Sequence, residues 1–351
     1  MTQLRSQSSH LSLTLFMIIA GAVSCPAQTV LVRHAPILNG RLEGSVQQME
    51  AENVTLSGSG AITGDLLVPG SPTVRLSGRP VFGGTVVGTG RAAPSNYRVT
   101  LNGRAFLGHL HSRIDPIKLP KVNAPPRPAG GRRVTLNKPR QSPGDFSTIR
   151  DLTLDGRAGE VALAPGTYGN FISNGNSSFV LGQSGSSIPA IYNFQSLTLN
   201  GNGTLRIVGP VIVTLHEGLS TRSPTGSPPH PEWLKLRIAS GGLSLKSHGS
   251  FYGYLEAPDG TLTINGNALL VGGAVCDRLI IKGNGRLRPV AAAITNRSPE
   301  VALTSPANGA NFVFPSGITL TAAANDPDGA VVTVEFRDGA AKLGVASPPS
   351  P

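Results

Sequence analysis

The residues that could support hydrolysis or elimination chemistry are carboxylates, and they are few. Asp145, Asp151 and Asp155 lie close together in the chain, and Glu256 and Asp259 flank a proline. A polysaccharide lyase or hydrolase needs two or three carboxylates that converge on one groove, for acid–base work or for Ca²⁺. Each of these acids also fits a turn, where Asp accepts backbone hydrogen bonds. The sequence therefore assigns no catalytic residue, and a carbohydrate-active enzyme or carbohydrate-binding protein is the alternative interpretation.

Two pairs of residues are candidates for metal binding. His109 and His111 alternate along one expected strand, so their side chains face the same side and could share a metal. No third ligand is placed by the sequence, which favours a surface pair. Asp326 and Asp328 in Asn-Asp-Pro-Asp-Gly are weak candidates for Ca²⁺, but an acidic β-turn is the default for such a phrase. We expect no cofactor.

The two cysteines offer little redox chemistry. Cys25 falls in the leader, and Cys276 stands alone between two repeats, so no disulfide within the mature chain is expected after simple cleavage. We expect Cys276 to be a small buried hydrophobic residue, because no neighbouring base in the sequence would activate its thiol.

Positive charge is concentrated in one proline-rich segment. The chain carries a formal net charge of +11, and residues 118–140 contain seven basic residues and no acidic one. Such a segment is typical of an excursion or linker, and its charge could contact an anionic cell-envelope polymer or polysaccharide; a solvated loop is the alternative. Aromatic residues make up 5% of the chain, too few for the stacking that would indicate specific nucleic-acid recognition. The basic residues are Lys118, Lys121, Arg127, Arg132, Arg133, Lys138 and Arg140.

The N-terminal segment 1–27 has the pattern of a secretory signal peptide. Arg5 precedes an apolar run over 11–22, and small residues follow at Ala22, Ser24 and Ala27. The run is too short for a spanning helix, so we expect export to the extracellular space or cell surface with no transmembrane span in the mature chain. Lipidation at Cys25 is the alternative, because Ala22-Val-Ser-Cys25 is similar to a lipobox.

One phrase recurs through the chain and must position everything else. It is an apolar–polar–apolar triplet followed by a small polar residue and usually Gly, as in Leu262-Thr-Ile-Asn-Gly-Asn267. The triplet predicts a short strand with one buried face, and the Asn-Gly pair predicts a corner because both tolerate left-handed backbone angles. Asn repeated at one corner could also form a hydrogen-bonded ladder. Clear copies begin at Val54, Val74, Val99, Leu152, Leu197 and Leu279.

The spacing of these copies selects the architecture. The shorter steps, such as those from Leu243 to Leu262 and from Leu262 to Leu279, suit one coil of a parallel β-helix with three short strands. Larger steps indicate either an inserted loop or two coils in which the second phrase has decayed. We therefore predict an all-β fold: a parallel β-helix (β-solenoid) followed by an incomplete immunoglobulin-like β-sandwich.

The C-terminal segment 300–351 closely resembles the first half of a bacterial immunoglobulin-like domain. The resemblance rests on Ser-Pro-Ala-Asn-Gly at 305–309 and Asn-Asp-Pro-Asp-Gly at 325–329, and it implies strands near 300–304, 317–324 and 331–337. A whole sandwich of this kind needs roughly 100 residues. We therefore expect the chain to be truncated at Pro351.

The repeated region resembles exported β-helical proteins of bacteria and, more distantly, bactofilin-type polymer-forming coils, on the strength of its Leu-Thr-Leu-Asn-Gly phrases. The expected organisation is a signal peptide (1–27), β-helix blocks at 28–117 and 141–290 around the basic excursion (118–140), a linker (291–299) and a partial Ig-like domain (300–351). The expected function is non-catalytic: a structural or adhesion-type surface scaffold that displays loops and the Ig-like domain, with end-to-end self-association as a further expectation.

Overall fold

The computed structural model describes residues 29–290, 300–307, 310, 317–325, 334–338 and 341–346. Residues 29–290 belong to one compact unit, and the described residues from 300 onward belong to a second. The two units are treated separately below. The predicted signal peptide, the linker 291–299, Asp326 and Asp328 lie outside the described residues.

The first unit is a stack of parallel strands, called here the parallel stack. Its 26 strands form one hydrogen-bonded sheet system, in which every pairing is parallel. A first block of strands precedes residue 113 and a second follows residue 131. The first block comprises β1 (Thr29–Val32), β2 (Ile37–Leu38), β3 (Arg41–Leu42), β4 (Ser45–Gln48), β5 (Val54–Leu56), β6 (Ala61–Leu67), β7 (Thr73–Gly78), β8 (Val81–Phe82), β9 (Thr85–Val87), β10 (Arg98–Gly103) and β11 (Phe106–Ser112).

The second block contains the longest strands and two short 3₁₀ turns. It comprises β12 (Arg132–Leu136), η1 (Phe146–Thr148), β13 (Ile149–Leu154), β14 (Glu160–Ala162), β15 (Gly166–Ser173), β16 (Ser178–Leu181), β17 (Ala190–Leu199), β18 (Thr204–Ile207), β19 (Val211–Leu215), β20 (Leu219–Thr221), β21 (Thr225–Gly226), η2 (Pro231–Trp233), β22 (Leu234–Ile238), β23 (Gly241–Leu245), β24 (Ser250–Ile264), β25 (Leu269–Ile281) and β26 (Arg286–Pro289).

The recurring phrase forms the wall and corner that its pattern predicts. In β24, Leu262 and Ile264 are fully buried, and Leu262 is registered between Leu243 of β23 and Leu279 of β25. One coil therefore runs from Leu243 to Leu262, and the next runs from Leu262 to Leu279. At the corner, Gly266 has φ +74°. The apolar positions thus stack on one another along the core, which is the stabilising burial expected of a repeat that contacts its neighbours.

Asparagines at the corners form the expected ladders. Asn200 donates to Asn174 at 3.0 Å, Asn202 donates to Asn176 at 3.0 Å, and Asn284 donates to Asn267 at 3.0 Å, each through the side-chain amide. These bonds satisfy amide groups that would otherwise compete for water at the turn. These ladders give the corner asparagines a structural role, as the sequence predicts.

Between Leu152 and Leu197 one strand occupies the position of the recurring phrase although its sequence no longer matches that phrase. Phe171 of β15 is registered with Leu152 on one side and with Leu197 on the other. The segment Phe171-Ile-Ser173 therefore occupies the wall position without the Leu-Thr-Leu sequence. Of the two explanations open from spacing alone, the decayed coil is correct here.

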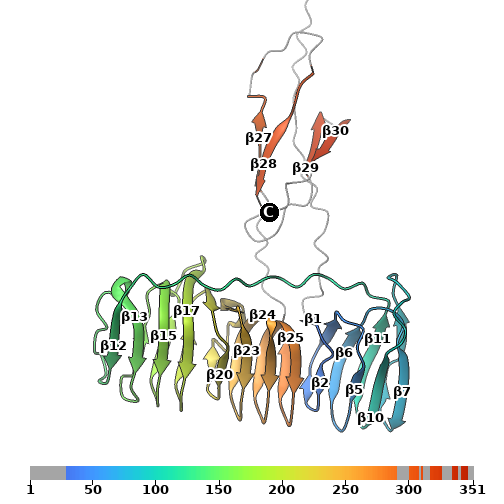
Figure 1. Ribbon diagram of the computed structural model, residues 1–351, viewed down its shortest axis with the longest axis horizontal. Coiled ribbons are helices and arrows are strands. Elements are labelled where there is room, and N and C mark those ends of the chain that lie inside the picture. The colour runs from blue at the N-terminus through green and yellow to red at the C-terminus, as the bar shows by residue number, and fades with distance from the viewer. Residues whose placement is uncertain are drawn as a thin grey trace, which may run out of the picture. The chain divides into compact units, whose positions relative to one another are not determined.

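The sequence does not predict which strands of the first and second blocks pair with one another. β1 pairs with β25, β2 pairs with β25, and β3 pairs with β26, so the first coil of the chain lies against the last coil of the second block. We call this junction the seam. Figure 1 shows the result: strands of both blocks stand in one row, with β1 and β2 next to β25. The first described strand, β1, therefore lies within the row of strands, between β25 and β4.

The two ends of the parallel stack differ. At one end β10 is inserted between β5 and β7, which leaves β7, β8 and β9 as the outermost strands, each paired only on one side among the described residues. Their apolar side chains are exposed: Leu76 and Val81 by 55%, Val86 by 43% and Val87 by 62%. At the other end, Leu136 of β12 is buried and Phe146 packs against the core. We call these the open end and the covered end.

Residues 113–131 form an extended strap that returns the chain from the open end to the covered end. Figure 1 shows it crossing the whole row of strands. Eleven successive pairings separate β11 from β12, about 53 Å at about 4.8 Å each, and nineteen extended residues span about 63 Å. The strap is therefore nearly taut. Gln195 donates to the Pro126 carbonyl at 2.8 Å and Val122 is 5% exposed, so the strap lies on the wall.

The predicted boundaries of the basic excursion need correction. The composition of residues 118–140 predicts an excursion outside the wall over this whole range. Instead Arg132–Leu136 form β12, which pairs with β13. The phrase Val134-Thr-Leu136 carries the usual alternation, and the proline-rich part ends before it. The extended excursion is 113–131.

The second unit contains two antiparallel pairs among its described residues. β27 (Glu300–Ser305) pairs with β28 (Thr321–Asn325), and β29 (Val334–Asp338) pairs with β30 (Ala341–Ala346). Strands were expected near 300–304, 317–324 and 331–337, and β27, β28 and β29 overlap these ranges. β30 was not expected, because its sequence, Ala341-Lys-Leu-Gly-Val-Ala346, lacks a strong β-branched pattern.

Candidate functional site

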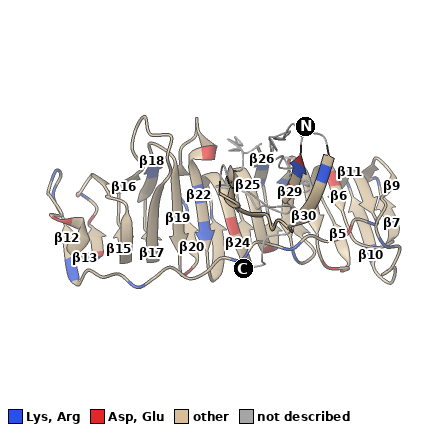
Figure 2. Cartoon of the chain, turned by 90° about the horizontal axis from the view of Figure 1, so that it is seen from above, with Lys and Arg blue, Asp and Glu red and all other residues tan. Residues whose placement is uncertain are grey.

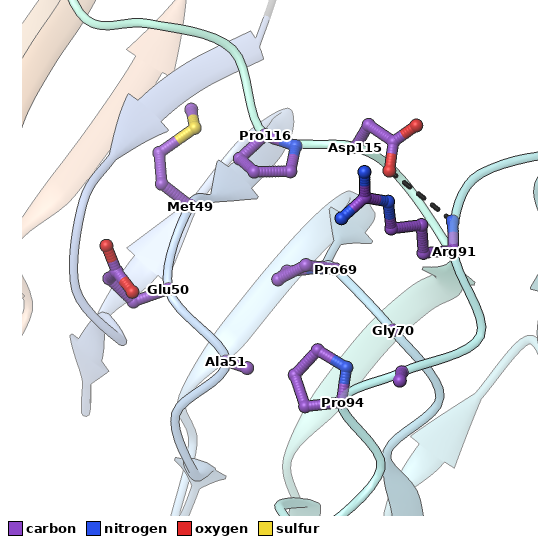
Figure 3. Close-up of a pocket in the computed structure, with 10 residues that line it drawn as sticks. Met49, Glu50, Ala51, Pro69, Gly70, Arg91, Pro94, Asp115 and Pro116 are labelled. Atoms are coloured by element: carbon purple, nitrogen blue, oxygen red, sulfur yellow. Dashed lines mark hydrogen bonds between the residues drawn. The ribbon is translucent and has the colours of Figure 1, made fainter.

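A hollow with charged side chains on its rim lies in the first block, where the strap begins. It has a volume of about 470 Å³ and is lined by corners that follow β4 and β6, by the loop before β10 and by the first residues of the strap. Glu50, Arg91 and Asp115 supply its charges, and the side chain of Met49 and three prolines supply its apolar surface. Figure 3 shows Glu50 on one side and Asp115 with Arg91 on the other.

The walls of this pocket are held by backbone hydrogen bonds. Ser71 N donates to the Pro94 carbonyl at 2.9 Å, and Arg113 N donates to the Gly70 carbonyl at 2.7 Å. Gly70 has φ +65°, and a Cβ there would collide with the Pro94 carbonyl oxygen, so glycine is required. The Tyr97 hydroxyl donates to the Pro69 carbonyl, and burial raises the pKa of Tyr97 to about 12. The pocket is thus built on fixed loops.

The side chains that line the pocket support carboxylate chemistry. Asp115 Oδ1 accepts a hydrogen bond from the Arg91 backbone N at 3.4 Å, and Glu50 is exposed at the opposite side. Two carboxylates across a hollow could bind hydroxyl groups or act as an acid–base pair. The sequence analysis did not single out Glu50, Arg91 or Asp115. Arg91 and Asp115 lie close before Pro94 and Pro116, but no local signal in the sequence distinguishes Glu50.

The acids considered from the sequence do not converge in one groove. Asp145 caps η1 by accepting from Ser147 N at 2.9 Å, and these hydrogen bonds hold the pKa of Asp145 below its usual value. Asp151 is 2.8 Å from Arg150 Nη2. Burial opposes ionisation of Asp151, but hydrogen bonds from Arg150 and from Asn170 N outweigh it and lower the pKa. Asp155 is exposed at a corner.

Two further acids are engaged in ion pairs on the wall. Glu256 lies 2.7 Å from Lys235 Nζ and 3.2 Å from Arg237 Nε. Asp259 lies 3.0 Å from Arg33 Nη2, across the seam. Both acids therefore have structural partners.

The two histidines face the same side, as expected, and share a carboxylate. His109 Nδ1 lies 3.2 Å from Asp65 Oδ1, and His111 Nε2 lies 3.3 Å from Asp65 Oδ2. Asp65 comes from β6, the neighbour of β11. Within the part of the chain that the structure describes, no group of three or more His, Cys, Asp or Glu residues has the arrangement of a metal site.

Cys276 is the buried residue that the sequence predicts. Its side chain is fully enclosed and burial raises the pKa of the thiol to about 12. A thiol in this state is a poor nucleophile.

The seven basic residues proposed for contact with anionic polymers fall into two groups. Lys118, Lys121 and Arg127 are exposed along the strap, which Figure 2 shows running beside the stack. Arg132, Arg133, Lys138 and Arg140 lie at the covered end. In this second group, Arg132 donates to the Pro143 carbonyl at 2.6 Å and Arg133 Nε lies 3.2 Å from Asp151. The strap and the covered end are therefore two separate candidate surfaces.

Comparison with known proteins identifies the second unit. Residues 299–350 match the family model described as a bacterial Ig domain. No curated protein and no solved structure matches the chain. Among the described residues, no helix has the length and apolar character required to cross a bilayer. The chain is an all-β protein that carries a bacterial Ig domain at its C-terminal part.

Proposed function

We propose that the protein is a non-catalytic, exported surface scaffold, in which the parallel stack is a β-helix that displays loops and the Ig domain. The observation that carries the proposal is the unbroken series of parallel pairings from β12 to β11, closed across the seam. In such a stack each coil contacts only its neighbours, which gives a stiff body of defined length. Bacterial Ig domains occur typically at the cell surface, which supports the extracellular placement.

The length and rigidity of the parallel stack in solution are the direct test of this proposal. Small-angle X-ray scattering of the full chain should give a rigid section about 60 Å long, from the strand spacing. Surface labelling of intact cells should reach exposed strap lysines such as Lys118 and Lys121. A flexible chain in solution, or a protein that is labelled only after lysis, would contradict the proposal.

Self-association through the open end is part of the same proposal. The outermost strands β7, β8 and β9 present free edges and exposed apolar side chains, whereas every interior coil has another coil against both faces. The surface that matches such an edge is another coil of the same type, so the occupant is a second copy. Leu76→Lys with Val86→Lys should convert dimers to monomers in sedimentation, and Arg75→Gln, on the same β7, should not. A monomeric wild-type chain at high concentration would rule out this contact.

Contact with anionic envelope polymer is assigned to the strap. Replacing Lys118, Lys121 and Arg127 by Ser should weaken salt-sensitive retention on an anionic polysaccharide matrix, because these exposed charges have no acidic partner among the described residues. The matched control replaces Arg132, Arg133 and Arg140 at the covered end, where two of the three side chains are already paired. Equal losses in both variants would show a general charge effect rather than a strap contact.

The pocket of Glu50 and Asp115 favours a second candidate function, that of a carbohydrate-active enzyme. Glu50 and Asp115 line one hollow, and most glycosidases use two carboxylates, one on each side of the bond that is cleaved. New reducing ends produced from a polysaccharide by the wild-type chain, and lost in both Glu50→Gln and Asp115→Asn, would favour the enzyme over the scaffold. Retention of that activity in both variants would exclude this pocket.

A further inference from the structure

A second hollow, of about 490 Å³, lies on the opposite block beside the seam. It is lined by Asn267, Ala268, Leu269, Asn284, Arg286 and Arg288. Three of these residues, Asn267, Ala268 and Asn284, come from consecutive corners, and the other three come from β25 and β26, which follow those corners. Its volume falls in the range of small-molecule sites.

The corner that follows this hollow along the stack contains two residues, whereas the corners on either side of it contain four. Ile281 and Arg286 are separated by four residues, and they are registered with Leu38 and Arg41, which are separated only by Asn39 and Gly40. The next coil returns to four residues, since Leu38 and Arg41 are registered with Leu56 and Ala61. A corner of two residues cannot extend as far from the core as its neighbours. The wall therefore recedes on the seam side of Asn284.

Glycine is required in the short corner. A Cβ on Gly40 would lie 2.5 Å from the Gly285 carbonyl oxygen and 2.6 Å from Ile281 Cγ2. The short corner thus packs tightly against the coil before it, and the space outside it is not filled by a side chain of Gly40. The recess is a consequence of the backbone path.

The asparagine ladder ends at the recess. Asn267 contacts His248 Nε2 at 3.2 Å and accepts from Asn284 Nδ2 at 3.0 Å. The short corner has no residue at the position equivalent to Asn284, so the Asn284 side-chain oxygen has no donor among the described residues. An acceptor and the neighbouring amide are therefore presented at the rim of the hollow.

The charge around the recess is positive. Arg286 is exposed and makes no side-chain hydrogen bond or ion pair within the described residues, whereas Arg288 Nε lies 2.8 Å from Glu43 Oε2. Arg41, registered with Arg286, lies 3.4 Å from the other oxygen of Glu43. One carboxylate thus faces three guanidinium groups, which fixes two of them and leaves Arg286 available. An available guanidinium binds carboxylate with two parallel hydrogen bonds.

We propose that this recess is a binding site for a carboxylate-bearing sugar, such as a uronic acid unit of an acidic polysaccharide. Arg286 binds the carboxylate, with Arg288 held beside it by Glu43. The Asn284 amide accepts from and donates to ring hydroxyls, and the half-buried Leu269 side chain packs against the C–H face of the ring. This site goes beyond the scaffold function and does not depend on it, so its failure leaves the scaffold proposal intact.

The test is calorimetric titration of the full chain with a galacturonate trisaccharide, with its methyl ester as the uncharged counterpart and inorganic phosphate as the bare anion. The free acid should bind and the ester should bind at least about tenfold more weakly, the effect of losing hydrogen bonds to a charged group. Arg286→Gln should reduce affinity for the free acid by a similar factor. Arg75→Gln, an exposed arginine on β7, makes the same charge change elsewhere and should have no effect.

A second variant separates a shaped site from simple charge attraction. Insertion of Gly-Asn between Asn39 and Gly40 restores the four-residue corner and fills the recess, while every arginine stays in place. We expect this insertion to abolish binding of the acid trisaccharide. Binding that survives the insertion, binding that is equal for acid and ester, binding of phosphate as tight as that of the trisaccharide, or no binding by the wild-type chain would each overturn the proposal.

Discussion

The β24–β25 interface and the seam both hold neighbouring coils of the parallel stack together, but they do so through different contacts. β24 and β25 are consecutive in the chain and pair continuously over 250–257 and 261–264. At the seam, β25 and β26 meet β1, β2 and β3 from the first coil of the chain, and each of these pairings covers only two residues. Where chain connectivity and long strands do not hold neighbouring coils together, side chains must do so.

The seam is accordingly rich in ion pairs. Arg33 lies 3.0 Å from Asp259 and 3.2 Å from Asp277, and His34 Nε2 lies 3.7 Å from Asp277. These pairs connect the residues that follow β1 to Asp259 of β24 and Asp277 of β25. The two blocks are therefore joined at the seam by the two-residue corner at Asn39 and Gly40 and by ion pairs. The following predictions test these two contributions separately.

The largest effect is expected from the short corner. Gly40→Val should lower the free energy of unfolding by about 3 kcal/mol, because its side chain would enter space occupied by Gly285 and Ile281. Gly58→Ala, at a four-residue corner with φ +64° and no atom within 4 Å, should cost about 1 kcal/mol from backbone strain alone. Trp233 is the only tryptophan in the chain and packs against the core of the stack, so denaturant titration by fluorescence reports this unit. Equal effects of the two substitutions would contradict the tight corner.

The ion pairs should contribute less. Asp277→Asn removes the partner of Arg33 at 3.2 Å and of His34 at 3.7 Å, and should cost about 1 kcal/mol, the upper range for partly exposed pairs. Glu160→Gln is the matched control, because Glu160 and Arg206 are both more than half exposed, and it should cost under about 0.5 kcal/mol. A seam that tolerates Asp277→Asn as well as the control would show that backbone pairing is sufficient.

Acid should have a smaller effect, on the seam through Glu43 and on the neighbouring corner of the first block through Glu52. The hydrogen bond from Arg288 lowers the pKa of Glu43; burial opposes ionisation of Glu52, but hydrogen bonds from Ala35 N and His34 lower its pKa overall. A lowered folded-state pKa gives stability that is present above the ordinary value of 4.5 and is lost as pH falls through the folded value. Unfolding profiles of wild type and Glu43→Gln/Glu52→Gln should therefore converge at acid pH and separate above pH 4.5. Parallel profiles over the whole range would be inconsistent with this linkage.

The sequence predicts the repeated short strand and its corner but not the order in which the strands pair. Alternation in Leu262-Thr-Ile264 is a local property, so the buried face and the Asn-Gly corner could be predicted and are confirmed. Pairing of Leu31 with Val275 is not local: any apolar strand of a parallel stack fits any other, and only the complete path of the chain selects the partner. The insertion of β10 between β5 and β7 escapes sequence analysis for the same reason.

The candidate sites were missed for a related reason. The pocket at the start of the strap is formed by three segments that are distant in sequence and contribute Glu50, Arg91 and Asp115. Only the folded path of the chain brings these segments together. Arg286 looks like an ordinary exposed strand residue until the two-residue corner at Asn39 and Gly40 is aligned with the corner at 282–285. The difference in corner length indicates the recess only when the register of β2 and β3 with β25 and β26 is known.

The central claim is that one chain closes its own stack by placing β1 against β25, and a disulfide across the seam tests it directly. Val32 and Cys276 are registered partners, and neighbouring strands lie about 4.8 Å apart, within the Cα separation of a disulfide. In a chain with Cys25→Ser, Val32→Cys should form an intramolecular disulfide with Cys276 during refolding in a glutathione redox buffer. Refolding is needed because burial raises the pKa of the Cys276 thiol to about 12.

Val30→Cys is the control, because residue 30 lies two positions along the same buried face and is not registered with Cys276. The account predicts that non-reducing electrophoresis and mass spectrometry will show a cross-linked monomer for Val32→Cys and free thiols for Val30→Cys. Free thiols in both variants, or a bond that forms only between two chains, would contradict it.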